Sequence, residues 1–88
     1  MKIKSEYHCA FFERQKEAEK FADNLKNIYK EIGFISRNDF RKLLGFDGFP
    51  VGEKIGWNSI EELQIVYGKY HGKNGWKVIL PKAQKLNL

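Results

Sequence analysis

The sequence contains a single cysteine, Cys9, and therefore cannot form an intramolecular disulfide. Small domains without disulfides are typical of reducing compartments. No run of apolar residues approaches the roughly 18 that a membrane-spanning helix needs. Residues 1–6 also lack the apolar core of a signal peptide. These absences predict a cytoplasmic protein that has no contact with a membrane.

Acidic residues are absent after Glu62, and arginine is absent after Arg41. Residues 63–88 nevertheless carry five lysines, at positions 69, 73, 77, 82 and 85. The whole chain of 88 residues has a net charge of +5, so its entire positive excess falls in this last segment. We therefore expect an anionic partner, if the protein has one, to be met there.

Recognisable catalytic and metal-binding motifs are also missing. The adjacent pair His8 and Cys9 with the distant His71 cannot supply the four closely spaced ligands of a zinc site, and the simpler interpretation is a small buried thiol beside a surface histidine. Cys9 has no base held in place by a third group. The glycines between positions 45 and 56 match no phosphate-binding motif. We expect no enzymatic activity, cofactor, metal or small-molecule substrate.

The first third of the sequence predicts an amphipathic helix. Its apolar residues recur at spacings of three and four: Ala18, Phe21, Ala22, Leu25, Ile28, Tyr29 and Ile32. Because no turn residue interrupts positions 6–32, we expect one long helix within residues 1–33, ended by Gly33. The alternative for its beginning is a strand in which Ile3, Ser5, Tyr7 and Cys9 alternate with polar residues.

A short second helix is expected over residues 36–45, where Ser36 and Asp39 form a capping box and Gly45 ends the helix. Residues 46–58 hold several glycines and one proline, which predicts an irregular loop anchored on the core by Trp57. A helical turn capped by Asn58 or Ser59 is expected next.

Residues 59–81 are expected to combine this helical turn with a β-hairpin. Asn74-Gly75 supplies a strong hairpin signal, because both residues accept positive φ, and Pro81 ends the second strand. Residues 82–88 are expected to fray. The prediction is a single α+β domain over residues 1–88: a helical hairpin packed on a β-hairpin through the glycine-rich loop.

The predicted hairpin carries the strongest candidate for a binding site. Its basic and aromatic residues are Lys69, Tyr70, His71, Lys73 and Lys77, with Tyr67 and Trp76 between them. Such a set can contact phosphates or stack on bases, and the lack of arginine favours nonspecific binding. In the alternative interpretation, the lysines only protect an exposed edge strand. A second candidate comprises Arg37, Arg41 and Lys42 on the short helix.

Three stretches resemble small accessory proteins of bacteriophages and conjugative elements of Gram-positive bacteria: residues 35–45, residues 52–58 and residues 76–81. The likeness covers roughly residues 15–82 and carries no catalytic residue. It implies a mobile-element protein in the cytoplasm of a bacterial host. Our first hypothesis is a non-enzymatic binder of a host or phage protein or protein–nucleic acid complex, including inhibition of nucleic-acid-processing or defence (anti-CRISPR-like) complexes. The alternatives are a nonspecific nucleic-acid-binding module and a virion or assembly component.

Overall fold

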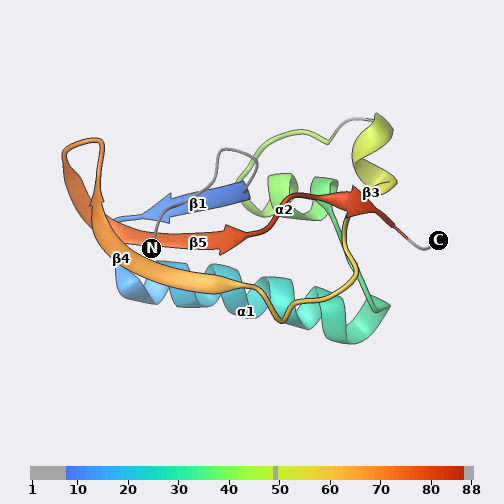
Figure 1. The fold of residues 1–88 in the computed structure, drawn as a ribbon, viewed down its shortest axis with the longest axis horizontal. Coiled ribbons are helices and arrows are strands. Elements are labelled where there is room, and N and C mark those ends of the chain that lie inside the picture. Colours follow the sequence, from blue (N-terminus) through green and yellow to red (C-terminus); the bar gives the residue numbers. More distant parts are fainter. Residues whose placement is uncertain (1–7, 49, 87–88) are drawn as a thin grey trace.

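A computed structural model describes residues 8–48 and 50–86, and over these residues it shows an α+β fold with two α-helices and two three-stranded antiparallel sheets (Figure 1). The elements follow in the order β1 (His8–Phe12), α1 (Gln15–Ile32), β2 (Ile35–Ser36), α2 (Arg37–Leu43), a 3-10 helix η1 (Pro50–Glu53), β3 (Ile55–Trp57), β4 (Gln64–Tyr70), β5 (Lys73–Leu80) and β6 (Gln84–Lys85). The mixed class expected from the sequence is confirmed. None of the described helices is both long enough and apolar enough to span a bilayer.

The larger sheet has the strand order β1-β5-β4 and packs one face against α1 (Figure 1). The apolar stripe of α1 buries Ala18, Phe21, Ala22 and Leu25 in the same core cluster as Ala10, Val78 and Leu80. Because side chains alternate along a strand, the residues between these point away from α1. We call that second surface the outer face; it consists of Cys9, Phe11, Gln64, Val66, Gly68, Tyr70, Lys73, Gly75, Lys77 and Ile79.

The predicted long N-terminal helix is wrong at its beginning. Residues 8–12 form β1, which pairs with β5, and α1 starts only at Gln15. The helical stripe of apolar residues begins at Ala18, and upstream of it Ala10 and Phe12 instead alternate into the core from a strand. The alternative of a strand near Cys9 is therefore correct for that residue, whereas Ile3, Ser5 and Tyr7 lie outside the described residues.

The hairpin turn also differs from the prediction. The chain reverses at His71 and Gly72, which have φ values of 50° and 81°, while Asn74 and Gly75 belong to β5. Two consecutive residues with positive φ match the tight turn preferred in hairpins. Gly75 cannot lie in the turn because it is buried in the sheet, where a Cβ would come within 2.6 Å of the Phe11 ring.

The smaller sheet overturns two expectations at once, since the glycine-rich loop contains β3 and the expected frayed tail contains β6. β3 lies between β2 and β6, and Leu86 just beyond β6 is buried. Gly56 permits this pairing, because a Cβ there would overlap the Ile35 carbonyl oxygen. Such short strands, paired across long stretches of chain, leave no alternating pattern in the sequence.

The helical signals around the smaller sheet have mixed outcomes. The capping box is confirmed: the Asp39 backbone N–H donates to Ser36 Oγ at 3.0 Å, and the Ser36 N–H donates to the Asp39 carboxylate at 3.0 Å. α2 ends at Leu43, followed by Gly45 with a φ of 87°. The helical turn expected from Ser59 is only a hydrogen-bonded turn, in which the Glu61 N–H donates to Ser59 Oγ at 3.2 Å.

Candidate binding surface

The three hairpin lysines do not form one cluster. Lys73 and Lys77 lie on β5 and point to the outer face, whereas Lys69 lies on β4 and shares the α1 side of the sheet with Tyr67. His71 occupies the turn itself. β5 pairs with β4 over residues 73–79 but with β1 only over residues 76–80, so Lys77 lies between two paired strands whereas Lys73 lies beyond the end of β1. Protection of a strand edge can therefore explain Lys69 and Lys73, but it cannot explain Lys77.

Tyr70 is the centre of an ordered cluster on the outer face. Its hydroxyl donates to the Val66 carbonyl oxygen at 3.3 Å, and its ring meets Phe11 edge-on with ring centres 5.9 Å apart. The Lys77 ammonium nitrogen lies 4.3 Å from the centre of the Tyr70 ring, in the position of a cation–π contact. These three contacts fix the orientation of an amphipathic ring on the sheet.

A pair of glycines makes room for the two rings on the sheet. Gly68 on β4 pairs with Gly75 on β5. A Cβ at Gly68 would come within 3.2 Å of the Tyr70 hydroxyl, and one at Gly75 within 2.6 Å of the Phe11 ring. The two rings thus occupy the space left by the missing side chains, an arrangement known to stabilise glycines within sheets. The backbone therefore helps to set the shape of the aromatic cluster.

The sequence indicated Tyr70 and Lys77 but missed Phe11. Its contact with Tyr70 depends on the register of β1 on β5, in which Phe11 pairs with Lys77. Only recognition of β1 as a strand could have predicted this neighbour.

A mixed-charge hollow adjoins the cluster where β1 leads into α1. Its volume is about 610 Å3, and its lining residues are Phe11, Phe12, Glu13, Arg14, Glu17 and Lys73. The Lys73 ammonium pairs with the Glu13 carboxylate at 3.3 Å, and both side chains are mostly exposed. An exposed pair of this kind contributes little to stability, so Lys73 can exchange Glu13 for an external carboxylate.

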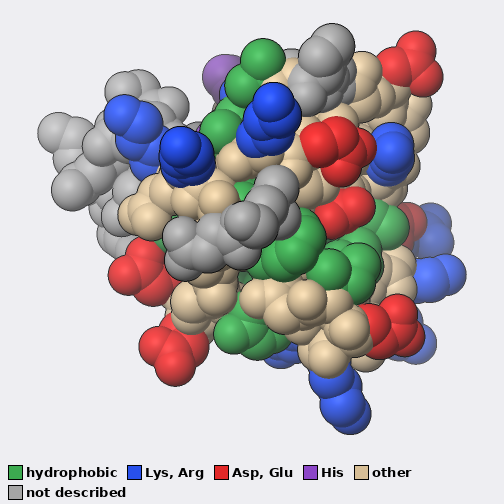
Figure 2. Space-filling view, turned by 90° about the vertical axis from the view of Figure 1, so that its right-hand side faces the viewer, with side chains coloured by type: hydrophobic (Ala, Val, Ile, Leu, Met, Phe, Trp, Pro, Cys, Tyr) green, Lys and Arg blue, Asp and Glu red, His purple; other side chains and the backbone are tan. Residues whose placement is uncertain are grey.

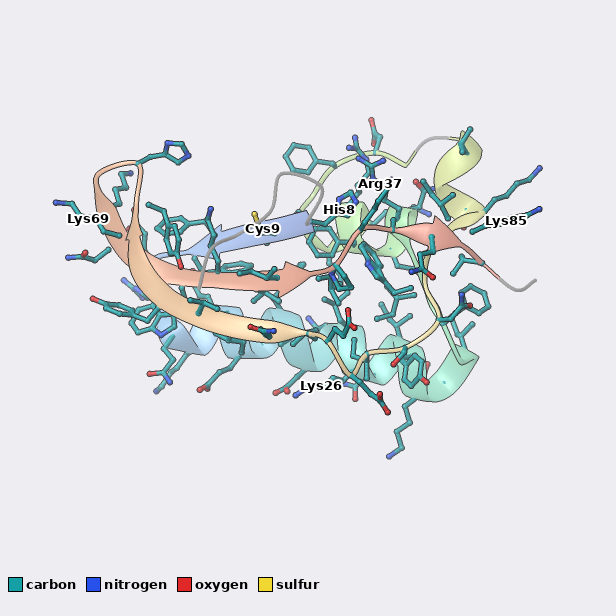
Figure 3. All side chains as sticks on the ribbon, viewed as in Figure 1. His8, Cys9, Lys26, Arg37, Lys69 and Lys85 are labelled. Carbon is teal, nitrogen blue, oxygen red and sulfur yellow. The ribbon has the colours of Figure 1, made fainter. Side chains whose placement is uncertain are left out.

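The second predicted cluster, on α2, lies away from the hairpin turn. Figure 3 shows Lys69 and Arg37 in separate regions of the molecule, so the structure does not bring the two candidate sets together. Lys42 pairs with Glu53 at 3.7 Å. The Arg41 Nε donates to the Asp47 carbonyl oxygen at 3.0 Å, and its guanidinium lies 5.6 Å from the centre of the Phe46 ring. Intramolecular contacts thus already engage Arg41 and Lys42.

The basic C-terminal segment is likewise divided. Lys85 lies at the opposite end of the molecule from Lys69 (Figure 3). At that end, Lys and Arg side chains are interspersed with Asp and Glu around apolar side chains (Figure 2). The positive excess that is continuous in sequence therefore does not form one continuous surface.

The environments of His8 and Cys9 are the reverse of those expected. Cys9 is exposed on the outer face, whereas His8 is half-buried with its ring centre 5.4 Å from that of Trp57 and 6.5 Å from that of Phe40. Burial, and secondarily the positive charge of Arg37, lower the pKa of His8 below its ordinary value. Among the described residues, no three His, Cys, Asp or Glu side chains are grouped closely enough to hold a metal ion.

Stability should fall as the solution is acidified through the titration range of His8. Its pKa is lowered in the folded state, so the unfolded chain binds more protons below the ordinary histidine pKa of about 6.5. The histidine contribution is therefore fully present above that pH and is lost as the pH falls toward the folded-state pKa. We expect the drop in melting temperature between about pH 7.5 and pH 5 to be larger for wild type than for His8→Phe.

Calorimetry of both proteins across this pH range measures the effect. All other ionisable groups are common to the two proteins, so the difference between the two curves isolates His8. Parallel curves would contradict the assignment.

No family model, curated protein or solved structure matches this chain.

Proposed function

We propose that the protein is a non-enzymatic binding protein that attaches to an acidic surface of a protein partner through the Tyr70 cluster on the outer face. The observation that carries the proposal is the preorganised set of Phe11, Tyr70 and Lys77. Interface hot spots are enriched in aromatic residues because these bury a large area at a low entropic cost. A lysine beside the ring adds attraction for carboxylates.

The alternative, nonspecific binding of a single-stranded nucleic acid, is less well supported by the same geometry. Bases stack on open aromatic faces, but Lys77 covers the Tyr70 ring and the two rings fill the glycine positions. A base would have to displace the Lys77 ammonium first. The hollow beside the cluster is lined by Glu13 and Glu17 as well as by Arg14 and Lys73, and a protein surface can offer charges of both signs to match them, whereas a phosphate backbone offers only one. A protein partner suits this mixture of charges better.

The resemblance to small phage and conjugative-element proteins supports an accessory role in a bacterial host. On this proposal the protein acts stoichiometrically, by occupying a surface of a host nucleic-acid-processing or defence complex. The net positive charge of the protein supports contact with an acidic surface of the partner. It argues against imitation of DNA, for which the protein itself would have to present an acidic surface. The cytoplasm of the host cell is the compartment in which such a partner would be met.

Purification of tagged protein from the native host tests this proposal with Tyr70→Ala and the control Lys26→Glu. Lys26 is exposed on α1, away from the outer face. We expect a protein partner to co-elute with wild type and with Lys26→Glu, and to be reduced at least about tenfold with Tyr70→Ala. Equal capture by all three would refute the Tyr70 cluster as the binding site. Salt-sensitive retention of random oligonucleotides, with no protein partner, would instead establish the nucleic-acid alternative.

A further inference from the structure

β4 is an edge strand with outward-pointing backbone groups. It pairs with β5 on one side, and no other described strand pairs with its second edge. The tight turn at His71 and Gly72 makes Tyr70 and Lys73 a hydrogen-bonded pair. Hydrogen-bonded and non-hydrogen-bonded pairs then alternate along the ladder. The backbone N–H and C=O groups of Ile65, Tyr67 and Lys69 therefore point away from β5.

The same three residues place their side chains together on the α1 side of the sheet. Tyr67 is 58% exposed and Ile65 is 38% exposed, although both are large apolar side chains. Proteins usually protect such an edge with charges, proline or a bulge, because it can pair with another strand. Among the three residues, only Lys69 carries a charge. Backbone hydrogen-bonding groups and exposed apolar side chains thus coincide on one edge.

We infer that two copies of this protein associate through their β4 edges, in antiparallel register about Tyr67. This register pairs Tyr67 with Tyr67 of the second copy and Ile65 with Lys69 of the second copy. Each pair exchanges two backbone hydrogen bonds, because all of these groups point outward. Along this edge no two like charges face each other, and the stem of Lys69 can cover the exposed Ile65 of the other chain.

Charge at the two ends of β4 favours a second copy over an unrelated extended peptide. Exposed Glu61 and Glu62 precede the strand, whereas Lys69 and Lys73 flank its far end. Antiparallel pairing about Tyr67 carries Glu62 to the position opposite the turn at Gly72 in the second copy. The acidic end of each strand then meets the basic end of the other, at both ends of the interface.

The dimer would join the two larger sheets into one continuous sheet, with both outer faces on the same side. In this register Tyr70 lies opposite Gln64 of the second copy, so the two Tyr70 clusters would lie on the shared outer face, where a repetitive or dimeric partner could engage both at once. Self-association and partner binding are separate properties, since Tyr70 points to the outer face and Tyr67 to the opposite one.

Sedimentation velocity over about a hundredfold range of protein concentration tests the dimer. We expect wild type to shift from monomer to dimer. Ile65→Lys places two lysines opposite each other at both ends of the interface and should weaken dimerisation at least about tenfold. The double variant Ile65→Lys/Lys69→Glu restores an opposite-charge pair and should recover dimerisation. A wild type that stays monomeric at every concentration would overturn the inference.

Lys69→Pro provides a second test that does not depend on charge pairs alone. The lost N–H points away from β5, so the hairpin keeps its own ladder, and proline is tolerated on edge strands. We expect a folded monomer by circular dichroism and sedimentation, while Tyr70→Ala remains a dimer even where it loses partner capture. A dimer unaffected by Lys69→Pro, or a charge-swapped pair that does not re-associate, would overturn the β4 register. Loss of capture of another protein by Lys69→Pro, with a monomeric wild type, would show that a foreign strand occupies this edge instead.

Discussion

Replacement of Trp57 by alanine should cost about 3–5 kcal/mol of the free energy of unfolding. Trp57 is only 3% exposed and packs among aromatic rings, with its centre 5.6 Å from that of Phe40. Its indole Nε1 also donates to the Pro81 carbonyl oxygen at 2.7 Å, which connects β3 to the end of β5. Domains of this size are stable by only about 5–15 kcal/mol, so much of the variant should be unfolded near physiological temperature.

Two control variants separate the contributions of Trp57. Trp57→Phe retains most of the apolar area but lacks the donor to Pro81, so its loss of stability should be smaller. Trp76→Ala removes the same kind of ring from a half-buried position against Tyr67, and should also cost less. Urea denaturation followed by circular dichroism measures all three. A Trp57→Ala protein with the urea midpoint of wild type would contradict its place in the core.

Local signals in the sequence were sufficient for the parts of the fold that depend on near neighbours. The spacing of Ala18, Phe21 and Leu25 predicted α1, and the pair Ser36 and Asp39 predicted the cap of α2. The large aromatic side chain of Trp57, directly after Gly56, predicted an anchor for the glycine-rich loop. For α1 and the cap of α2, the residues that contact each other are only a few positions apart in the sequence. For Trp57, the side chain is so large and apolar that burial is its most stable state.

The incorrect predictions concern features that distant residues decide. Within the five residues of β1, polar and apolar side chains follow neither the spacing of a helix nor the alternation of a half-buried strand. The strand forms by pairing with β5, which lies near the other end of the sequence. Asn74-Gly75 is a strong local turn signal, but the need to accommodate the Phe11 ring places Gly75 inside the sheet. For the same reason, the candidate site was only half predictable. Tyr70 and Lys77 could be selected as candidates because aromatic and basic residues are common in binding sites. The contribution of Phe11 depends on the register of β1 on β5. The separation of Lys69 from the cluster depends on which side of the sheet its side chain occupies.

Reversal of the three hairpin lysines, with Lys69, Lys73 and Lys77 all changed to glutamate, should weaken association with an acidic partner by about two orders of magnitude. The change turns the local charge of residues 63–88 from +5 to −1. It removes the ammonium over the Tyr70 ring and replaces the ammonium that pairs with Glu13 by a carboxylate that repels it. The fold should survive, because Lys69 and Lys73 are exposed and contribute little to stability, and the half-buried Lys77 loses only its contact with the Tyr70 ring at the surface of the sheet.

The matched control reverses Lys16, Lys20 and Lys26, which are exposed on α1 and undergo the same change of six charge units. Partner affinity is measured for wild type and both variants at low and high salt. Wild-type affinity should fall with salt, the hairpin variant should be weak with a flatter salt dependence, and the α1 variant should stay close to wild type. If both variants lose affinity equally, net charge alone drives association. If neither does, the partner is bound elsewhere, and the surface around Arg37, Arg41 and Lys42 becomes the next to test.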